Sequence, residues 1–224
     1  MIEVLERKIN ETAYEYALRV IKYNIVSLNL IPGEMIRHED ICSLLSVSKT
    51  PVRDAIRELS DYKLVDIFPQ RGSYVAKIDP QVVESAGYLR KVLEVEIVSS
   101  ACEVASSEHL DQLYQNIALQ KRYLGDIKRF FQLDDHFHQI LYAMCGKEFL
   151  YEVVQRISYQ YDRLRLLNLV YIDPADVFSD HEVLLYAVEA GDKARARQTI
   201  QEHLARVEIN RFAIKEKYSE YIMQ

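Results

Sequence analysis

Residues 46–59 read Ser-Val-Ser-Lys-Thr-Pro-Val-Arg-Asp-Ala-Ile-Arg-Glu-Leu, and this stretch decides the fold of the first third of the chain. Ser48 is a good N-cap residue and Pro51 is tolerated in a first helical turn, so we expect a helix over about residues 48–62. A tight break precedes this helix, and a shorter helix fits residues 39–45. The sequence therefore predicts two helices joined by a tight turn.

The flanking segments extend this unit. Residues 12–28 carry apolar side chains three or four positions apart, which predicts a helix, and the Leu-Ile-Pro-Gly sequence at 30–33 ends it. Residues 64–68 and 73–77 read as strands on either side of a turn. This order of elements is typical of a winged helix-turn-helix. Residues 1–11 indicate only a flexible or short helical lead.

The character of the chain changes after Asp79-Pro80, where no convincing strand follows. Helical patterns with suitable caps run over about residues 81–106, 107–125, 127–145, 147–170, 180–190 and 192–217. We therefore expect a mainly α protein. A winged helix-turn-helix domain covers residues 1–78, and an all-α helical bundle that can enclose a pocket covers residues 79–224.

Composition limits what these two domains can do. The chain has 224 residues with only 6 Gly and 5 Pro, which favours long helices, and no apolar run is long enough to cross a membrane. Its 3 cysteines are far apart and form no disulfide framework, so we expect a reducing cytoplasm. Residues 1–78 carry 11 Lys or Arg and 11 Asp or Glu, so the net charge of -6 lies in residues 79–224. Any nucleic-acid face must therefore be a local patch.

The second helix of the helix-turn-helix is the expected DNA reader, because such a helix enters the major groove with its first turns. Polar and basic side chains that can contact phosphates or base edges lie there: Ser48, Lys49, Thr50, Arg53 and Arg57. Gly72 at the expected hairpin tip would let the backbone approach the minor groove beside Arg71. Alternatively, the arginines are solvated charges paired with acidic residues of the same helix.

Separated elements of this domain resemble the GntR family of bacterial transcription regulators. They are Leu30-x-Pro32-Gly33, Ile41 with Leu44, Val47 to Ile56 with Leu59, Leu64-Val65, and Arg71-Gly72-x-x-Val75. Two positions depart from the family pattern, which usually has Arg in place of Lys49 and Gly in place of Lys63. The resemblance implies DNA contacts from Lys49, Thr50, Arg53, Arg71 and Gly72, and a phosphate or base contact from Arg37.

In the second domain, four polar residues fall on apolar helix faces. Asp134 and His138 are four residues apart and share a face with phenylalanine and leucine side chains, and His181 and His203 lie on similar stripes of their own helices. Burying a carboxylate beside imidazoles without a partner is costly, and a metal is one such partner. One Asp and three His form an N/O ligand set that would leave one or two positions open for water or a carboxylate.

Plainer interpretations exist for each residue. A lone inward histidine is more often a hydrogen-bonded core residue than a ligand, and Asp134 with His138 could form an internal ion pair. Only the joint occurrence of all four favours a metal. The other histidines, His38, His109 and His136, are assigned to surface or structural roles.

The same region resembles the FCD domain, the helical effector-binding domain of the FadR branch of GntR regulators. The matching stretches are Asp134-x-x-Phe137-His138, Asp180-His181, Gly191-Asp192 with Ala196, and His203-Leu204. The resemblance implies that Asp134, His138, His181 and His203 coordinate a divalent ion, with Zn or Ni as the first choices. It argues against a fatty-acyl-CoA ligand, because the members that bind acyl-CoA typically lack this set.

Arg90 is the candidate for binding a small carboxylate effector. It shares its helix face with Ala86, Leu93 and Ile97, and an inward arginine can bind a carboxylate with two hydrogen bonds. Alternatively, Arg90 pairs with Glu94 on the same helix. Tyr161 and Arg163 could also line the cavity.

These features together predict a cytoplasmic, homodimeric regulator that binds double-stranded operator DNA and responds to a metal and a small organic acid. We expect no enzyme activity and no membrane association, and repression released by ligand is the default. Two alternatives stay open. One is a metal sensor that needs no organic acid, and the other is a metal-dependent hydrolase in which the site activates water.

Overall fold

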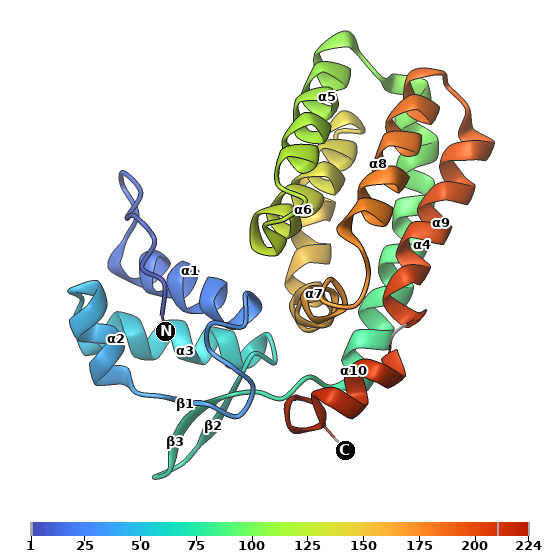
Figure 1. The fold of residues 1–224 in the computed structure, drawn as a ribbon. Coiled ribbons are helices and arrows are strands. Elements are labelled where there is room, and N and C mark those ends of the chain that lie inside the picture. The colour runs from blue at the N-terminus through green and yellow to red at the C-terminus, as the bar shows by residue number, and fades with distance from the viewer. Residues whose placement is uncertain (1, 210, 224) are drawn as a thin grey trace. The chain divides into compact units, whose positions relative to one another are not determined.

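The computed structural model describes residues 2–209 and 211–223 and divides into two compact units (Figure 1). One unit holds Met1–Val83 with Lys215–Gln224, and the other holds Glu84–Ile214. The expected fold class is confirmed, with a winged helix-turn-helix in the first unit and helices alone in the second. Within the described residues, we find no helix with the length and apolar character of a bilayer span.

Residues 12–76 of the first unit form three helices and a small sheet: α1 (Ala13–Val26), β1 (Met35–Ile36), α2 (His38–Leu45), α3 (Lys49–Asp61), β2 (Val65–Phe68) and β3 (Gly72–Val75). The sheet is antiparallel in the order β1-β3-β2. β1 was not predicted, because two residues are too few for an alternating pattern. Helix α1 packs on α3 through fully buried side chains such as Val20 and Leu59.

The segment before α1 is bound to that helix in an extended conformation. Glu3 N donates to Asn24 Oδ1 at 2.7 Å, and Asn24 Nδ2 donates to Glu3 O at 2.9 Å. Further along, the Arg19 guanidinium pairs with Glu11 at 2.6 Å. This arrangement differs from the flexible or short helical lead that we expected, because it depends on contacts with α1 that lie eight to 21 positions away along the chain.

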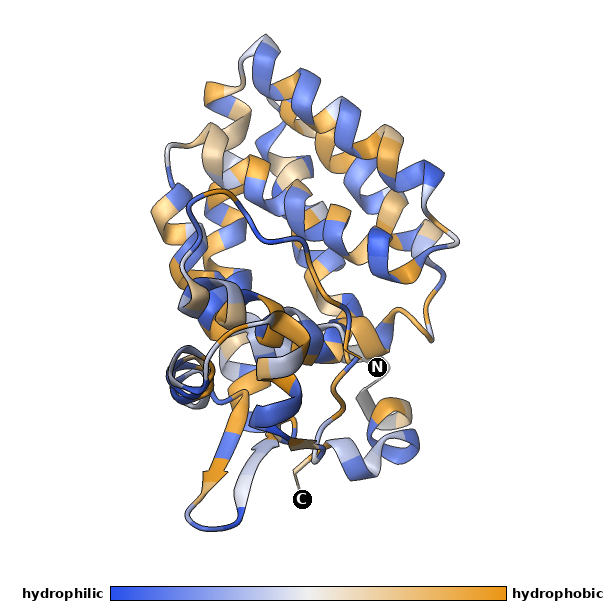
Figure 2. Ribbon diagram, turned by 90° about the vertical axis from the view of Figure 1, so that its left-hand side faces the viewer, coloured by the Kyte–Doolittle hydropathy of each residue, from blue (hydrophilic) through white to orange (hydrophobic). Residues whose placement is uncertain are grey.

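The helices after the sheet are α4 (Pro80–Val104), α5 (Ser107–Arg122), α6 (Ile127–Met144), α7 (Glu148–Asn168), α8 (Pro174–Glu189), α9 (Lys193–Ile209) and α10 (Arg211–Lys217), followed by a short 3-10 turn at Ser219–Tyr221. Hydrophobic residues recur every few positions between hydrophilic ones along the helical ribbons, as expected of amphipathic helices (Figure 2). In the second unit, α5 packs on α6 and α8, and α8 packs on α9. Phe137, Leu184 and Ile200 are fully or almost fully buried in its core.

Three boundaries differ from the sequence-based expectations. α8 begins at Pro174 rather than near residue 180, because Asp173 caps it by accepting from Ala175 N. The helix expected over 192–217 is present as α9 and α10, on either side of residue 210, which lies outside the described residues. The boundary between the two units falls after Val83 rather than after residue 78, and the end of the chain belongs to the first unit. The reason is a backbone pairing, in which Ile78 N donates to the carbonyl of Tyr221 at 2.8 Å.

Candidate functional site

Helix α3 presents the expected DNA-reading side chains to solvent. Val52, Ala55, Ile56 and Leu59 form its buried face, and the opposite face exposes Ser48, Lys49, Thr50, Arg53 and Arg57. Lys49 pairs with Glu39 at 3.1 Å and Arg53 with Asp54 at 3.8 Å, but the side chains of all four are more than half exposed. Such surface pairs contribute little, so the two cations can exchange these partners for phosphates.

The hairpin of β2 and β3 forms the wing. Arg71 is exposed at its tip, with its guanidinium 5.6 Å from the ring centre of Phe68. Gly72 has a φ of +112°, and a Cβ there would lie 2.8 Å from the terminal methyl group of Met35. A side chain at this position would therefore strain the backbone of the wing, and Met35 would have to move. Arg37 is also exposed, directly before α2.

The structure brings the four expected metal ligands together inside the second unit. Asp134 and His138 come from α6, His181 from α8 and His203 from α9. All four are buried, and one ligand atom of each lies within 4.8 Å of those of the others. Bonds of about 2.0–2.2 Å from a common centre would keep ligand atoms within such separations, so the cluster could hold a divalent ion.

Two of the three histidines have their Nδ1 atoms facing carboxylates. His138 Nδ1 lies 2.7 Å from Glu94 Oε2, and His203 Nδ1 lies 3.5 Å from Asp180 Oδ2. Neither Nδ1 atom meets hydrogen-bond geometry with its carboxylate, but an ionised carboxylate attracts a donor, so the two contacts favour the ring proton on Nδ1 in both histidines. The Nε2 atom of each ring then carries a lone pair.

His181 is oriented by a chain of amides. Asn116 Nδ2 donates to the carbonyl of Leu133 at 3.0 Å, which leaves Asn116 Oδ1 to accept from Gln120 Nε2 at 2.7 Å. The Gln120 Oε1 atom therefore faces His181 Nδ1, at 2.8 Å. This assigns the proton of His181 to Nδ1 as well, and its buried Nε2 has no hydrogen-bond partner among the described residues.

The consequence is a convergence of acceptors. His138 Nε2 and His203 Nε2 lie 3.2 Å apart, and His181 Nε2 lies 3.6 Å from Asp134 Oδ1. With the protons on Nδ1, three lone pairs and a carboxylate face one another in a buried space, an arrangement that repels itself unless a cation is bound. Oxygen partners behind ligand histidines are also the usual surroundings of a protein metal site.

Electrostatics keeps these groups in the protonation states that a metal requires. Burial and the neighbouring His203 lower the pKa of His181 well below its usual value, and burial also lowers the pKa of His203. Burial alone would raise the pKa of Asp134, but the Arg165 guanidinium and the histidines outweigh it and hold that pKa below its usual range. At neutral pH His181 and His203 are therefore neutral imidazoles and Asp134 is an ionised carboxylate.

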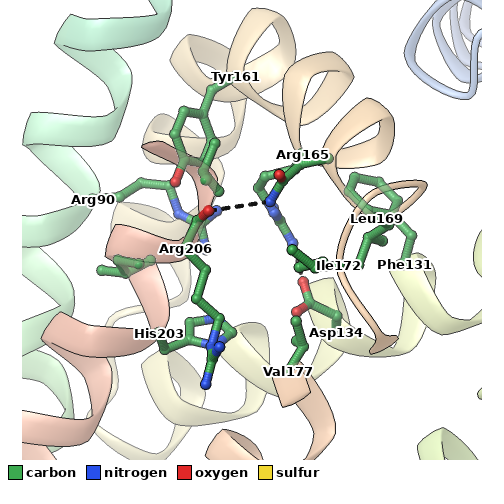
Figure 3. A pocket seen from close by; sticks show the side chains of 13 residues that line it. Arg90, Phe131, Asp134, Tyr161, Arg165, Leu169, Ile172, Val177, His203 and Arg206 are labelled. Carbon is green, nitrogen blue, oxygen red and sulfur yellow. Dashed lines mark hydrogen bonds and ion pairs between the residues drawn. The ribbon is translucent and has the colours of Figure 1, made fainter. Parts of the chain in front are cut away.

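A small pocket lies beside this cluster (Figure 3). Its lining includes Asp134 and His203 together with three arginines, Arg90, Arg165 and Arg206. Its free volume is about 30 Å³. A pocket with one metal-ligand face and several guanidinium groups has the chemistry to hold a small anion.

Arg90 lies in this pocket as the sequence predicted, and it also pairs with Glu94 as the alternative interpretation required. Arg90 Nε donates to Glu94 Oε1 at 2.7 Å, while the buried Arg90 Nη1 has no partner among the described residues. Its guanidinium lies 5.4 Å from the ring centre of Tyr161, which also lines the pocket. Arg163 instead donates to Gln160 and is absent from the lining.

Sequence reasoning missed two pocket arginines. Arg165 belongs to a stretch of α7, Ser158 to Asn168, in which every residue is buried, so no apolar stripe indicated which side chains point inward. Arg206 pairs with Asp180 at 2.5 Å. The spacing of Arg206 from His203, three residues later on one helix, was a usable signal.

Comparisons with known proteins agree with this architecture. Residues 13–75 match the family model of bacterial regulatory proteins of the gntR family, and residues 88–206 match the FCD domain. The HTH-type transcriptional repressor RspR of Escherichia coli is 25% identical, over 98% of this chain and 99% of its own length. An uncharacterized HTH-type transcriptional regulator in an unstable DNA locus of Streptomyces ambofaciens is 31% identical, over 82% of this chain and 78% of its own.

Solved structures share the fold. Escherichia coli McbR/YncC superimposes with a TM-score of 0.78 at 19% identity, covering 92% of this chain and 99% of that chain. A regulator described as GntR from Rhodococcus sp. RHA1 gives 0.71 at 20% identity, covering 89% and 98%.

A winged helix-turn-helix with exposed basic residues on its second helix is joined to a helical unit that holds a cluster of buried polar groups. This combination defines a DNA-binding transcription regulator. The chain belongs to the GntR family, in the FadR-like branch that carries an FCD domain. Members of this family are transcription regulators and not enzymes, so the hydrolase alternative is wrong.

Proposed function

We propose that this regulator binds a divalent metal at Asp134, His138, His181 and His203, and a small carboxylate at Arg90 beside it. The observation that carries the proposal is the clustering of one ligand atom each from Asp134 and three buried histidines within 4.8 Å of one another, with an oxygen atom near Nδ1 of each ring. The N/O ligand set suits Zn or Ni. The orphaned Nη1 of Arg90 supports a carboxylate ligand.

The metal assignment is tested by loading apoprotein with Zn²⁺ or Ni²⁺ in competition with a chromophoric chelator. His138→Ala should lose stoichiometric binding, and the stabilisation that metal gives to the wild type should disappear. His136→Ala is the matched control, because His136 is an exposed histidine on the same helix. Equal metal content in wild type and His138→Ala would remove the site.

For DNA, we propose contacts from Ser48, Lys49, Thr50, Arg53 and Arg57 on α3, from Arg71 and Gly72 on the wing, and from Arg37. The exposure of all these side chains supports this assignment, and Gly72, which is partly exposed, lies beside Arg71 at the tip of the wing. An operator selected in vitro from random duplexes gives the probe. Arg53→Ala should abolish its binding at moderate salt, whereas Arg156→Ala, which removes the same charge from an exposed position in the other unit, should not.

We further propose that residues 1–78 form the DNA-binding domain, that residues 79–224 form the effector domain, and that the protein acts as a homodimer. Two exposed apolar side chains four residues apart on α4, Tyr88 at 71% and Val92 at 49% exposure, support a covered face on that helix. A dimer would place two reading helices on two half-sites of a palindromic operator. Light scattering of the full chain tests this, and a monomer at micromolar concentration would contradict it.

Repression that a ligand releases is the proposed outcome, and the similarity to the transcriptional repressor RspR supports repression. An effector that binds one arrangement of the dimer better shifts the population toward it. A metal sensor without an organic acid remains the second candidate, favoured by the small volume of the pocket, about 30 Å³. Operator binding that follows Zn²⁺ or Ni²⁺ concentration in the absence of carboxylates would select that candidate.

A further inference from the structure

Arg165 pairs with one oxygen of the Asp134 carboxylate, Oδ2, while the other oxygen, Oδ1, lies 3.6 Å from His181 Nε2. Its guanidinium forms an ion pair with Asp134 Oδ2 and lies 2.9 Å from Asp162 Oδ1. It also lies 4.8 Å from the ring centre of Phe131. Arg165 is buried, so these contacts are made with little screening by water.

A divalent metal and this guanidinium need the same negative charge. Asp134 is the one carboxylate in the four-ligand cluster, so the positive charge of a metal would be balanced there first. Two cations on one buried carboxylate repel each other strongly at low dielectric. Arg165 keeps a second anionic partner, Asp162, one helical turn away on α7, so it can leave Asp134 without being stranded.

The size of the pocket implies that the metal binds before the carboxylate. Its free volume of about 30 Å³ holds roughly two water molecules, with Arg165 among the side chains that fill the rest. The pocket therefore offers little space for a carboxylate ligand beside Asp134 while Arg165 contacts it. Once Arg165 turns away from Asp134, space becomes available there, and the guanidinium has donors that Asp162 does not use.

We propose that Arg165 is the internal counter-cation of Asp134 in the metal-free protein, that a divalent metal displaces it, and that the displaced guanidinium then binds the carboxylate of the effector. This inference rests on the metal and carboxylate sites of the proposed function. Its consequence is an order of binding, in which the metal must enter before the acid.

The first test is the effect of Arg165→Gln on the affinity for Zn²⁺ alone, measured by chelator competition. Removing a competing cation should tighten zinc binding by about tenfold or more. Arg156→Gln, an exposed arginine on the same helix, is the matched control and should leave the affinity unchanged. Weaker or equal zinc binding in Arg165→Gln would overturn the inference, because Arg165 would then be a support of Asp134 and not its competitor.

The second test uses the wild-type protein, so it does not depend on the folding of a variant. The side-chain Nε–H signal of Arg165 in a ¹⁵N NMR spectrum is assigned by its absence from Arg165→Lys. Zn²⁺ should shift this signal, and acetate should shift it further only after zinc has been added. An equal acetate shift without zinc would overturn the binding order. Failure of the wild type to bind zinc at all would instead overturn the proposed function.

Discussion

Glu94 joins the two halves of the candidate effector site: its Oε1 accepts from Arg90 Nε at 2.7 Å, and its Oε2 lies 2.7 Å from His138 Nδ1. Burial alone would raise the pKa of Glu94, but the Arg90 guanidinium and the adjacent His138 imidazole outweigh it and lower that pKa. One ionised carboxylate thus orients both a pocket arginine and a candidate metal ligand.

This relationship predicts the result of Glu94→Gln. Glutamine keeps an oxygen acceptor but removes the charge behind His138, so we expect zinc affinity to fall by about 10- to 100-fold. Chelator competition measures this change. Glu96→Gln removes the same charge from an exposed position on α4 and should have no effect. Unchanged affinity in Glu94→Gln would mean that Glu94 serves only as a partner for Arg90.

The ion pair between Glu11 and Arg19 predicts a pH dependence in the first unit. The hydrogen bond from Arg19 lowers the pKa of Glu11 from 4.5 to about 2. Because the folded pKa is depressed, the stabilisation by Glu11 is fully present above pH 4.5 and is lost as the pH falls toward 2.

The measurement compares urea unfolding of wild type and Glu11→Gln at pH 6.5, 5.5, 4.5 and 3.5. The stability difference between the two proteins should be constant at the upper two values and should shrink at the lower two. A difference that stays constant down to pH 3.5 would show that the pair makes no net contribution.

The sequence predicted most of the fold because its local signals are strong. Ser48, Pro51 and the break before them located α3 within a residue of its observed start. The four ligand candidates were also predicted correctly as neighbours, because each lies on an otherwise apolar helix face. The start of α8 was missed although Asp173-Pro174 is a good cap and first-turn pair.

Contacts between distant segments could not be predicted in the same way. The partner of His181 at Nδ1 is Gln120, which is 61 positions away and whose orientation depends on Asn116. Arg165 lies in a stretch of α7 in which every residue is buried, so the spacing of apolar residues does not show which side chains point into the pocket. The groups that complete the candidate site are thus set by packing between helices rather than by spacing within one.

A substitution of Gly72 in the wing distinguishes a role of this glycine in stability from a role in DNA binding. Gly72→Ala introduces a Cβ 2.8 Å from Met35 Cε at a φ of +112°, so we expect a loss of about 1–3 kcal/mol in stability. The double variant Gly72→Ala, Met35→Ala relieves the close contact but keeps the backbone strain. If urea unfolding finds both variants as stable as wild type, the glycine is there for DNA and not for the fold.

Lys63 predicts a stabilising substitution at the end of α3. Its φ is +59°, and the backbone around it forms a helix-ending turn in which Leu64 N donates to the carbonyl of Leu59 at 2.9 Å and Lys63 N donates to that of Ser60 at 3.0 Å. The turn that glycine usually forms in the family is therefore present with lysine, at the expense of strain. Lys63→Gly should stabilise the first unit by about 0.5–1 kcal/mol, since the relieved strain exceeds the added chain entropy of glycine. Lys63→Ala keeps the strain while removing the side chain, so thermal unfolding should order the three proteins with glycine most stable. Equal stability of the glycine and alanine variants would show that the left-handed backbone at residue 63 carries no measurable strain.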